Sequence, residues 1–368
     1  MRPIKLKIKT KTQQYPIIIG SNLVSNISKI INNNSIKFRQ CLLIVDENIS
    51  KKIISKIKKS LKKKKLYVYF FKPSEVNKNL INTNKILSIL LNKNFSREDC
   101  LISIGGGITG DISGFAASLF KRGLKFINVP TTLLSQVDSS IGGKTGINTK
   151  YGKNLIGSFY QPNLVVTDIQ FLKTLPKREI VCGYGEILKH SLILNKKFFI
   201  FLNKHNKKIF KLSSPFIEKT IYESCKIKKK VVEKDEKEKG LRKILNFGHT
   251  FAHAYEASLD YSKKLNHGEA VILGIKTALN FSLKKNLLKK KDYYLIINHI
   301  NNCKLPSDIK NYFKLRDLNK ILSFMLKDKK NTSNKVSLVL LKKIGLALVN
   351  KEYNKKNLGL FLKHELIN

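Results

Sequence analysis

The sequence predicts an α/β domain built on a mostly parallel sheet, followed by an all-α-helical domain. Short apolar runs alternate with stretches of helical spacing up to about residue 176, and the strand signals fade after Pro176. Strands and helices in alternation indicate βαβ units and a parallel sheet. With 368 residues, the chain is long enough for two domains of roughly 100–200 residues each. We therefore predict one domain over residues 1–177 and a second over 178–368.

Periodicity assigns the individual elements. The buried strands of the first domain are predicted at 41–45 (CLLIV), 66–70 (LYVYF), 101–104 (LISI), 126–129 (FINV) and 164–167 (LVVT), with helices at 49–61 and 80–91 and an alternating strand at 4–9. The helices of the second domain are predicted at 179–194, 216–232, 246–259, 269–284 and 292–302. The segment 336–341 (VSLVLL) is the only late strand candidate.

The chain is strongly basic, with 71 Lys and Arg against 25 Asp and Glu and a formal net charge of +46. One interpretation is an electrostatic footprint for nucleic acid. The other is an A/T-rich coding bias, because the excess is Lys, accompanied by many Ile and Asn and spread along the whole chain. We favour the second and expect no specific nucleic-acid partner. A positive field also attracts anionic substrates.

Cysteine usage and the N-terminus indicate a reducing compartment. The five Cys lie far apart, without a C-x-x-C pair or an even framework. The N-terminus lacks the apolar stretch of a signal peptide, and no apolar run reaches the roughly 18 residues of a membrane span. We expect a cytoplasmic protein with no membrane partner.

A glycine loop follows the predicted strand 101–104 and opens a helix, with the sequence SIGGGITGD at 103–111. Consecutive glycines let a ligand approach the main chain, and a helix N-terminus favours phosphate. The spacing differs from G-x-G-x-x-G, so a tight turn without a ligand is the alternative. Asp46, Asn48, Glu75 and Lys78 follow other predicted strands. They suit either ribose contacts or helix caps and turns.

Small and hydroxylic residues are concentrated between residues 122 and 157. Lys144 and Lys153 each follow a glycine directly, a position suited to reaching an anion. Arg122 can offer a bidentate fork to phosphate or carboxylate. Since Lys is so common in this chain, a single Lys is more often a surface residue. The density of glycines around these two favours binding.

Histidines gather in the second domain. Of seven in the chain, three fall within nineteen positions: His249, His253 and His267. His249 and His253 share a helix face, and Glu186 lies on another predicted helix. Two imidazoles and a carboxylate suit a catalytic Zn²⁺ or a similar ion. The pattern leaves open which two of the three bind it, and capping or packing roles are the alternative.

Taken in order, these motifs closely resemble the dehydroquinate synthase family over most of the chain. The resemblance is carried by GGGITGD at 105–111, KRG at 121–123, VPTTLLSQVDSSIGGKTGIN at 129–148, GKNLIGSFYQP at 152–162, GEILK at 185–189, DEKEKGLRKILNFGHTFAHAYE at 235–256 and HGEAV at 267–271. The block from PTTLL to GGKT is highly specific. Mild departures, such as Gly185 where Ala is usual, remove no charged position.

The resemblance implies a Rossmann-like first domain and a lyase of the shikimate pathway, which leads to aromatic amino acids. Its members convert 3-deoxy-D-arabino-heptulosonate 7-phosphate to 3-dehydroquinate and phosphate. The implied steps are transient NAD oxidation, phosphate elimination, re-reduction and intramolecular aldol closure. The implied cofactors are NAD and one divalent metal, Zn or Co, and the implied assembly is a homodimer.

The resemblance also implies residue roles. Metal ligation falls to Glu186, His249 and His267, and His253 goes instead to the substrate's phosphate. Substrate contacts fall to Asp138, Lys144, Asn154, Lys189, Lys228, Arg242 and Asn246, with Arg122 and Lys329 arriving from a neighbouring subunit or a closing segment. NAD contacts fall to Asp46, Asn48, Glu75, Lys78, Gly106, Gly107, Asp111, Thr131, Thr132, Lys153 and Thr174.

Three other functions are weighed against this one. A sister sugar-phosphate cyclase would not use this substrate, and a polyol dehydrogenase of the same superfamily would release NADH stoichiometrically. A nucleic-acid-binding protein would account for the charge. It would leave the acidic and histidine residues of the second domain unexplained.

Overall fold

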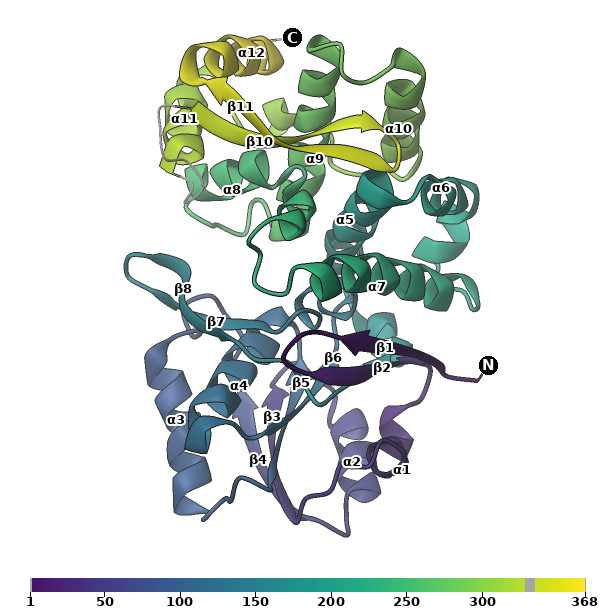
Figure 1. Ribbon diagram of the computed structural model, residues 1–368, viewed down its shortest axis with the longest axis vertical. Helices are drawn as coiled ribbons and strands as arrows, with labels where there is room; N and C mark the ends of the chain where they lie inside the picture. The colour runs from purple at the N-terminus through teal and green to yellow at the C-terminus, as the bar shows by residue number, and fades with distance from the viewer. Residues whose placement is uncertain (1, 328–334, 368) are drawn as a thin grey trace. The chain divides into compact units, whose positions relative to one another are not determined.

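The computed structural model describes residues 2–327 and 335–367 and divides the chain into two compact units (Figure 1). Unit 1 comprises Met1–Ile180 and Ser214–Lys237, and unit 2 comprises Val181–Ser213 and Glu238–Asn368. These units are defined by contacts, and the predicted domain boundary after residue 177 stays a prediction. The units differ from it chiefly in α7 (Phe216–Lys234), which packs on the first two strands of unit 1.

Within the described residues, seven strands form the main sheet of unit 1. They are β1 (Ile4–Lys9), β2 (Gln14–Gly20), β3 (Gln40–Asp46), β4 (Lys65–Phe71), β5 (Cys100–Gly105), β6 (Lys125–Pro130) and β9 (Leu164–Asp168). Their order is β1-β2-β9-β6-β5-β3-β4, with β1 and β2 antiparallel and the other pairs parallel. The predicted parallel sheet is confirmed, and every strand predicted between residues 4 and 167 lies at an observed one.

Helices cover both faces of this sheet. They are α1 (Ile27–Asn33), α2 (Lys51–Ser60), α3 (Leu80–Asn92) and α4 (Gly107–Leu119). Leu43 and Val45 of β3 pack in one buried cluster with residues of α1 and α2. Leu42 and Ile44 pack in another with residues of α3 and α4. Successive side chains of a strand point to opposite faces, so a sheet covered on both faces reads as a continuous apolar run.

The strand order places a topological switch point between β3 and β5. From β3 the chain adds β4 on one side and then returns to add β5 and β6 on the other. Ligands of open parallel sheets bind at the carboxyl ends of the strands beside such a point. A separate hairpin of β7 (Lys144–Thr149) and β8 (Gly152–Phe159) packs on α4 and extends from unit 1 (Figure 1).

Unit 2 is mainly helical. Its helices are α5 (Lys177–Leu194, which begins in unit 1), α6 (Lys196–Phe210), α8 (His249–Ser258), α9 (His267–Lys284), α10 (Lys290–Asn302), α11 (Leu318–Lys327) and α12 (Lys355–Ile367). It also holds an antiparallel hairpin of β10 (Lys335–Lys343) and β11 (Leu346–Asn354). β10 covers the predicted late strand, whereas β11 was not predicted because polar residues interrupt its apolar pattern. In the described part of the chain, no helix is long and apolar enough to cross a membrane.

A buried polar chain joins three helices of unit 2. The Tyr184 hydroxyl lies 2.9 Å from His299 Nε2, and His299 Nδ1 lies 3.0 Å from Oδ1 of Asn203. Because that amide oxygen only accepts, His299 carries its proton on Nδ1 and accepts from Tyr184. Burial lowers the pKa of His299 from 6.5 to about 4. The neutral imidazole therefore belongs to the folded state.

We expect this imidazole to make unit 2 sensitive to mild acid. Between pH 6.5 and 4, His299 is protonated in the unfolded chain and neutral in the folded chain. The free energy of unfolding therefore falls as the pH falls through this window. The expected loss is on the order of 2–3 kcal/mol. Unfolding by denaturant at pH 7, 6 and 5 should show a flatter dependence in His299→Gln than in the wild type. The exposed-site control His364→Gln should keep the wild-type slope, and equal slopes in all three proteins would contradict the prediction.

Candidate active site

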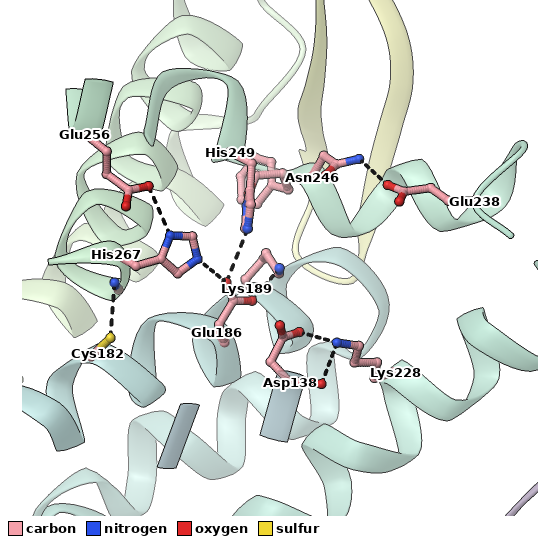
Figure 2. A network of polar contacts seen from close by, with 12 residues as sticks. Asp138, Cys182, Glu186, Lys189, Lys228, Glu238, Asn246, His249, Glu256 and His267 are labelled. Carbon is pink, nitrogen blue, oxygen red and sulfur yellow. Dashed lines mark hydrogen bonds and ion pairs between the residues drawn. The ribbon is translucent and has the colours of Figure 1, made fainter. Parts of the chain in front are cut away.

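Unit 2 brings one carboxylate and two imidazoles together from three helices (Figure 2). Glu186 lies in α5, and His249 and His267 are the first residues of α8 and α9. Oε1 of Glu186 lies 3.3 Å from His249 Nε2 and 3.8 Å from His267 Nε2. One ligand atom of each residue lies within 4.8 Å of the others.

Both imidazoles are oriented through their other nitrogen. His267 Nδ1 lies 3.0 Å from Oε2 of Glu256, and His249 Nδ1 lies 3.3 Å from the carbonyl oxygen of Phe247. A proton held on each Nδ1 leaves the Nε2 lone pairs directed toward Glu186. A carboxylate or carbonyl behind the ring is the usual support of a metal-binding histidine.

The electrostatics favour the metal-binding protonation states. Burial alone would raise the pKa of Glu186, but the ammonium of Lys189 and the His249 ring hold it well below 4.5. Burial and the charge of Lys189 lower the pKa of His249 from 6.5. An ionised carboxylate beside a neutral imidazole is the form in which both groups bind a cation.

The residues present fit a divalent metal. Both oxygens of Glu186 are fully buried, and their ion-pair contacts lack hydrogen-bond geometry within the described residues. A buried carboxylate without hydrogen bonds is costly. A cation on these oxygens would remove that cost. One carboxylate and two imidazoles are donors that zinc and cobalt accept.

Close backbone contacts fix the three helices that carry this group. A Cβ at Gly268 would lie 2.2 Å from the carbonyl oxygen of Cys182, and one at Gly274 would lie 2.2 Å from that of Gly248. The Cys182 thiol also accepts from the Gly268 N–H at 3.2 Å. Helix α9 therefore meets α5 and the start of α8 backbone to backbone, next to His267 and His249.

His253 lies outside the close group. It is exposed, one turn along α8. Its ring stacks on His267, with centroids 6.3 Å apart at 27°, and meets the His249 ring edge-on at 5.3 Å. The geometry thus favours His249 and His267 as the metal-binding pair over His249 and His253, which are four residues apart. It leaves His253 on the accessible side of the rings.

In unit 1, the residues expected at NAD collect at the carboxyl ends of parallel strands. Asp46 ends β3, Gly106 and Gly107 follow β5 and open α4, and Thr131 and Thr132 follow β6. Asn48, Glu75 and Lys78 lie in the connections after β3 and β4, Asp111 lies in α4, and Thr174 lies after β9. A Cβ at Gly106 would lie 3.2 Å from Thr132 Cγ2, so the glycine permits a tight approach.

Several of these side chains already hold one another. Oδ1 of Asp46 accepts from both nitrogens of Asn48 at 2.9 Å, forming a turn. The buried Lys78 donates to Asp111 and Asn154 at 2.5 Å each. Burial raises the pKa of Asp111, and the charge of Lys78 opposes the rise.

Glu75 joins the same group from the connection after β4. It pairs with Lys153 at 3.0 Å. Burial would raise the pKa of Glu75, but the Asn148 amide and the charge of Lys153 lower it overall.

The residues expected at the substrate fall in both units. In unit 1, Lys228 donates to the side chain and the carbonyl of Asp138 at 2.6 and 2.7 Å (Figure 2), and Lys144 is exposed at the start of β7. In unit 2, Lys189 and Arg242 are buried, and Asn246 donates to Glu238 at 3.1 Å.

Two expected residues do not join these groups. Arg122 follows α4 just before the start of β6, toward the amino ends of the parallel strands and away from their carboxyl ends. Lys329 lies outside the described residues.

Two polar residues of this region were not predicted from the sequence. Glu256 orients His267, and its spacing from His249 and His253 (i, i+4, i+7) could have marked a shared helix face. Asn148 bonds to both Glu75 and Asn154. Its only signal was its place at the end of the glycine-rich block.

The fold and the site define a class of enzyme in which a parallel α/β unit with a glycine loop is combined with a helical unit that carries a Glu/His/His group. Solved structures with this fold include 2-deoxy-scyllo-inosose synthase complexed with carbaglucose-6-phosphate, NAD⁺ and Co²⁺. It is 24% identical, with a TM-score of 0.87, and the match covers 98% of this chain and 100% of that one. Another is 2-epi-5-epi-valiolone synthase from Streptomyces hygroscopicus with NAD⁺ and Zn²⁺, at 22% identity, a TM-score of 0.84 and coverage of 97% and 98%.

The chain belongs to the 3-dehydroquinate synthase family. Residues 68–182 match the N-terminal family description and residues 183–331 the C-terminal one. The chain is 64% identical to 3-dehydroquinate synthase of Pelagibacter ubique over 99% of both chains. It is 42% identical to that of Alkaliphilus metalliredigens over 91% of this chain and 92% of the relative. The resemblance seen in the sequence is thereby confirmed.

Proposed function

We propose that the protein converts 3-deoxy-D-arabino-heptulosonate 7-phosphate to 3-dehydroquinate and phosphate, using NAD without net consumption and one divalent metal. The observation that carries the proposal is the Glu186, His249 and His267 group, in a chain of this family. When bound, NAD supplies a transient hydride acceptor and the metal, zinc or cobalt, supplies a Lewis acid at the oxidised hydroxyl.

In unit 2, Glu186, His249 and His267 hold the metal, and Lys189 lies directly beside the carboxylate. A buried ammonium at this place can orient a substrate hydroxyl or carboxylate that reaches the metal. His253 presents an accessible imidazole one turn away and contacts the substrate's phosphate. Arg242 and Asn246 add a cation and an amide for the remaining oxygens.

In unit 1, the glycine loop and the strand ends beside it hold NAD. Gly106 and Gly107 open α4, whose N-terminal N–H groups favour a pyrophosphate. Asp46 and Glu75 contact ribose hydroxyls, and Lys78 belongs to the same NAD site. Lys144 and Asn154, on the β7–β8 hairpin, take substrate oxygens, and Asn154 takes those of the phosphate. Lys228, which is buried, pairs with the half-buried Asp138 to form a polar group for the substrate.

Phosphate release from the heptulosonate phosphate tests this function, with and without NAD, Zn²⁺ and a chelator. Release that needs both cofactors and leaves no net NADH supports it. NADH accumulation without phosphate would indicate a polyol dehydrogenase. NAD binding without turnover of this substrate would indicate a sister cyclase with another sugar phosphate.

Glu256 should tune the metal site through His267. We expect Glu256→Ala to weaken Zn²⁺ binding by about 10–100-fold, because the ring loses the carboxylate that orients it and raises its basicity. Glu256→Gln keeps a hydrogen-bond acceptor without the charge and should lose less. Competition with a chelating dye measures the affinity without turnover. Wild-type Zn²⁺ affinity in Glu256→Ala would show that Glu256 does not support His267 in metal binding.

A homodimer also belongs to this proposal. Arg122 lies at the amino ends of the parallel strands, away from the carboxyl ends where the NAD residues collect, which favours a role in the site of a neighbouring subunit. Five cysteines without a disulfide among the described residues favour a reducing compartment such as the cytoplasm.

A further inference from the structure

Asn148 bridges two segments that carry different ligand contacts. Its Nδ2 donates to the side chain of Glu75 at 2.7 Å and to the Glu75 carbonyl at 2.9 Å. Its backbone N–H donates to the carbonyl of Lys78 at 2.7 Å. Its Oδ1 accepts from the backbone N–H of Asn154 at 3.0 Å. One half-buried amide thus connects the Glu75–Lys78 loop to the β7–β8 hairpin.

The hairpin is irregular at this position. Ile147 pairs with Ile156 and Thr149 with Gly152, so the pairing register shifts around Asn148. Bulges of this kind re-aim side chains beside active sites. Asn154 has a φ of +54°, a left-handed conformation that asparagine adopts more readily than most residues other than glycine. The bond from its N–H to Asn148 and the bond from Lys78 to its Oδ1 hold this conformation.

We propose that Asn148 is a positioning residue that couples the nucleotide contacts to the phosphate contact. The inference rests on the proposed function, which assigns Glu75 and Lys78 to NAD and Asn154 to the substrate's phosphate. A nucleotide that orders the Glu75–Lys78 loop also fixes Asn148, and Asn148 then fixes Asn154 for a phosphate group. By linkage, a bound phosphate strengthens nucleotide binding by the same factor.

The charges around the bridge support this direction of coupling. Lys78 and Lys153 are both committed to the loop and the hairpin, Lys78 through Asp111 and Asn154 and Lys153 through Glu75. A nucleotide hydroxyl that donates to Glu75 therefore weakens the ion pair between Glu75 and Lys153. Lys153 follows Gly152 and precedes Asn154. Loop occupancy then changes both the position and the charge offered to a phosphate.

The test is a calorimetric titration of the full-length, zinc-loaded protein with NAD, with and without saturating inorganic phosphate. In the wild type we expect phosphate to tighten NAD binding by at least about 5-fold. In Asn148→Asp the Asn154 N–H keeps an acceptor, but the donor to Glu75 is lost and two carboxylates face each other. The coupling factor should fall close to 1.

A charge-reversed pair separates coupling from simple damage. In the Glu75→Gln/Asn148→Asp variant, the amide of residue 75 can donate to the carboxylate of residue 148. We expect the coupling factor to return to several-fold, even though NAD alone binds more weakly. Asn163→Asp is the matched control, because Asn163 accepts from the Phe126 N–H at 2.8 Å at the amino ends of the parallel strands, away from the bridge. It should keep the wild-type factor.

Each other outcome overturns the inference. Absence of coupling in the wild type, full coupling in Asn148→Asp, or no recovery in the double variant would show that Asn148 is only structural. Failure of the proposed function is seen separately, because phosphate release from the heptulosonate phosphate is measured on the same wild-type protein. If coupling is lost in Asn148→Asp but the wild type releases no phosphate, the role of Asn148 stands and the proposed substrate is rejected.

Discussion

Replacement of His267 by Ala should abolish metal-dependent turnover while the fold is retained. The variant loses one of the three proposed metal ligands, which are Glu186, His249 and His267. With about 4 kcal/mol from each ligand of a zinc site, metal affinity should fall about 10³-fold. His253→Ala should keep its metal, because that ring lies outside the close group. It should lose turnover through weaker phosphate binding. Metal content after dialysis and initial rates of phosphate release measure the two effects separately.

The comparison decides between two ligand assignments. If His249 and His253 were the ligands, His253→Ala would lose the metal and His267→Ala would keep it. His364→Ala, at an exposed position of α12, should change neither quantity. Wild-type turnover of His267→Ala at trace metal would remove His267 from the site. Circular dichroism of each variant checks that the helices remain.

The choice between these histidines shows what local sequence spacing cannot decide. Helical periodicity correctly placed His249 and His253 on one face. Metal binding, however, depends on which Nε2 atoms converge and on what supports each Nδ1. The supports are Glu256 for His267 and the Phe247 carbonyl for His249. The contact between Glu256 and His267 arises only when α8 and α9 pack together, so local spacing cannot supply it.

The same distinction runs through the fold. The strands β3, β5, β6 and β9 were predictable because both faces of the sheet are buried there and the apolar runs are therefore continuous. β2 was not predicted, although it is also largely buried. The β7–β8 hairpin was not predicted as strands, because glycines replace the usual β-formers in it. A Cβ at Gly157 would lie 2.2 Å from the Thr145 carbonyl, so the two backbones touch where side chains would normally signal a strand.

Helix α7 illustrates a limit of periodicity for domain assignment. Its apolar spacing predicted a helix correctly. A helix pattern states which face is buried, but not the element that buries it. The partners of α7 include β1 and β2, more than 190 residues earlier in the chain, and the segment Ser135–Ser139 of the same unit. The local sequence is therefore enough to predict that α7 is a helix. Its packing in unit 1 depends on tertiary contacts.

Gly274→Ala should destabilise unit 2 strongly, although alanine is the better helix former. The substitution would gain about 1 kcal/mol of helix propensity in α9. It would also place a Cβ 2.2 Å from the Gly248 carbonyl oxygen and 2.9 Å from the Ala252 nitrogen. Both are backbone atoms of the turn that starts α8, so no side-chain rotation relieves the clash. Overpacking of this kind costs about 1–3 kcal/mol and occasionally more, and we expect a net loss of at least about 2 kcal/mol.

The free energy of unfolding in denaturant measures this loss, and Gly359→Ala is its matched control. Gly359 also lies in a helix, α12, but a Cβ there meets only Leu322 Cδ1 at 3.4 Å, an ordinary contact. The control should therefore gain up to about 1 kcal/mol. Because Gly248 directly precedes His249, Gly274→Ala should also weaken Zn²⁺ binding in the folded protein. Equal stability changes at the two glycines would show that α8 and α9 are not held by this backbone contact, and the rigid support of the metal site would have to be sought elsewhere.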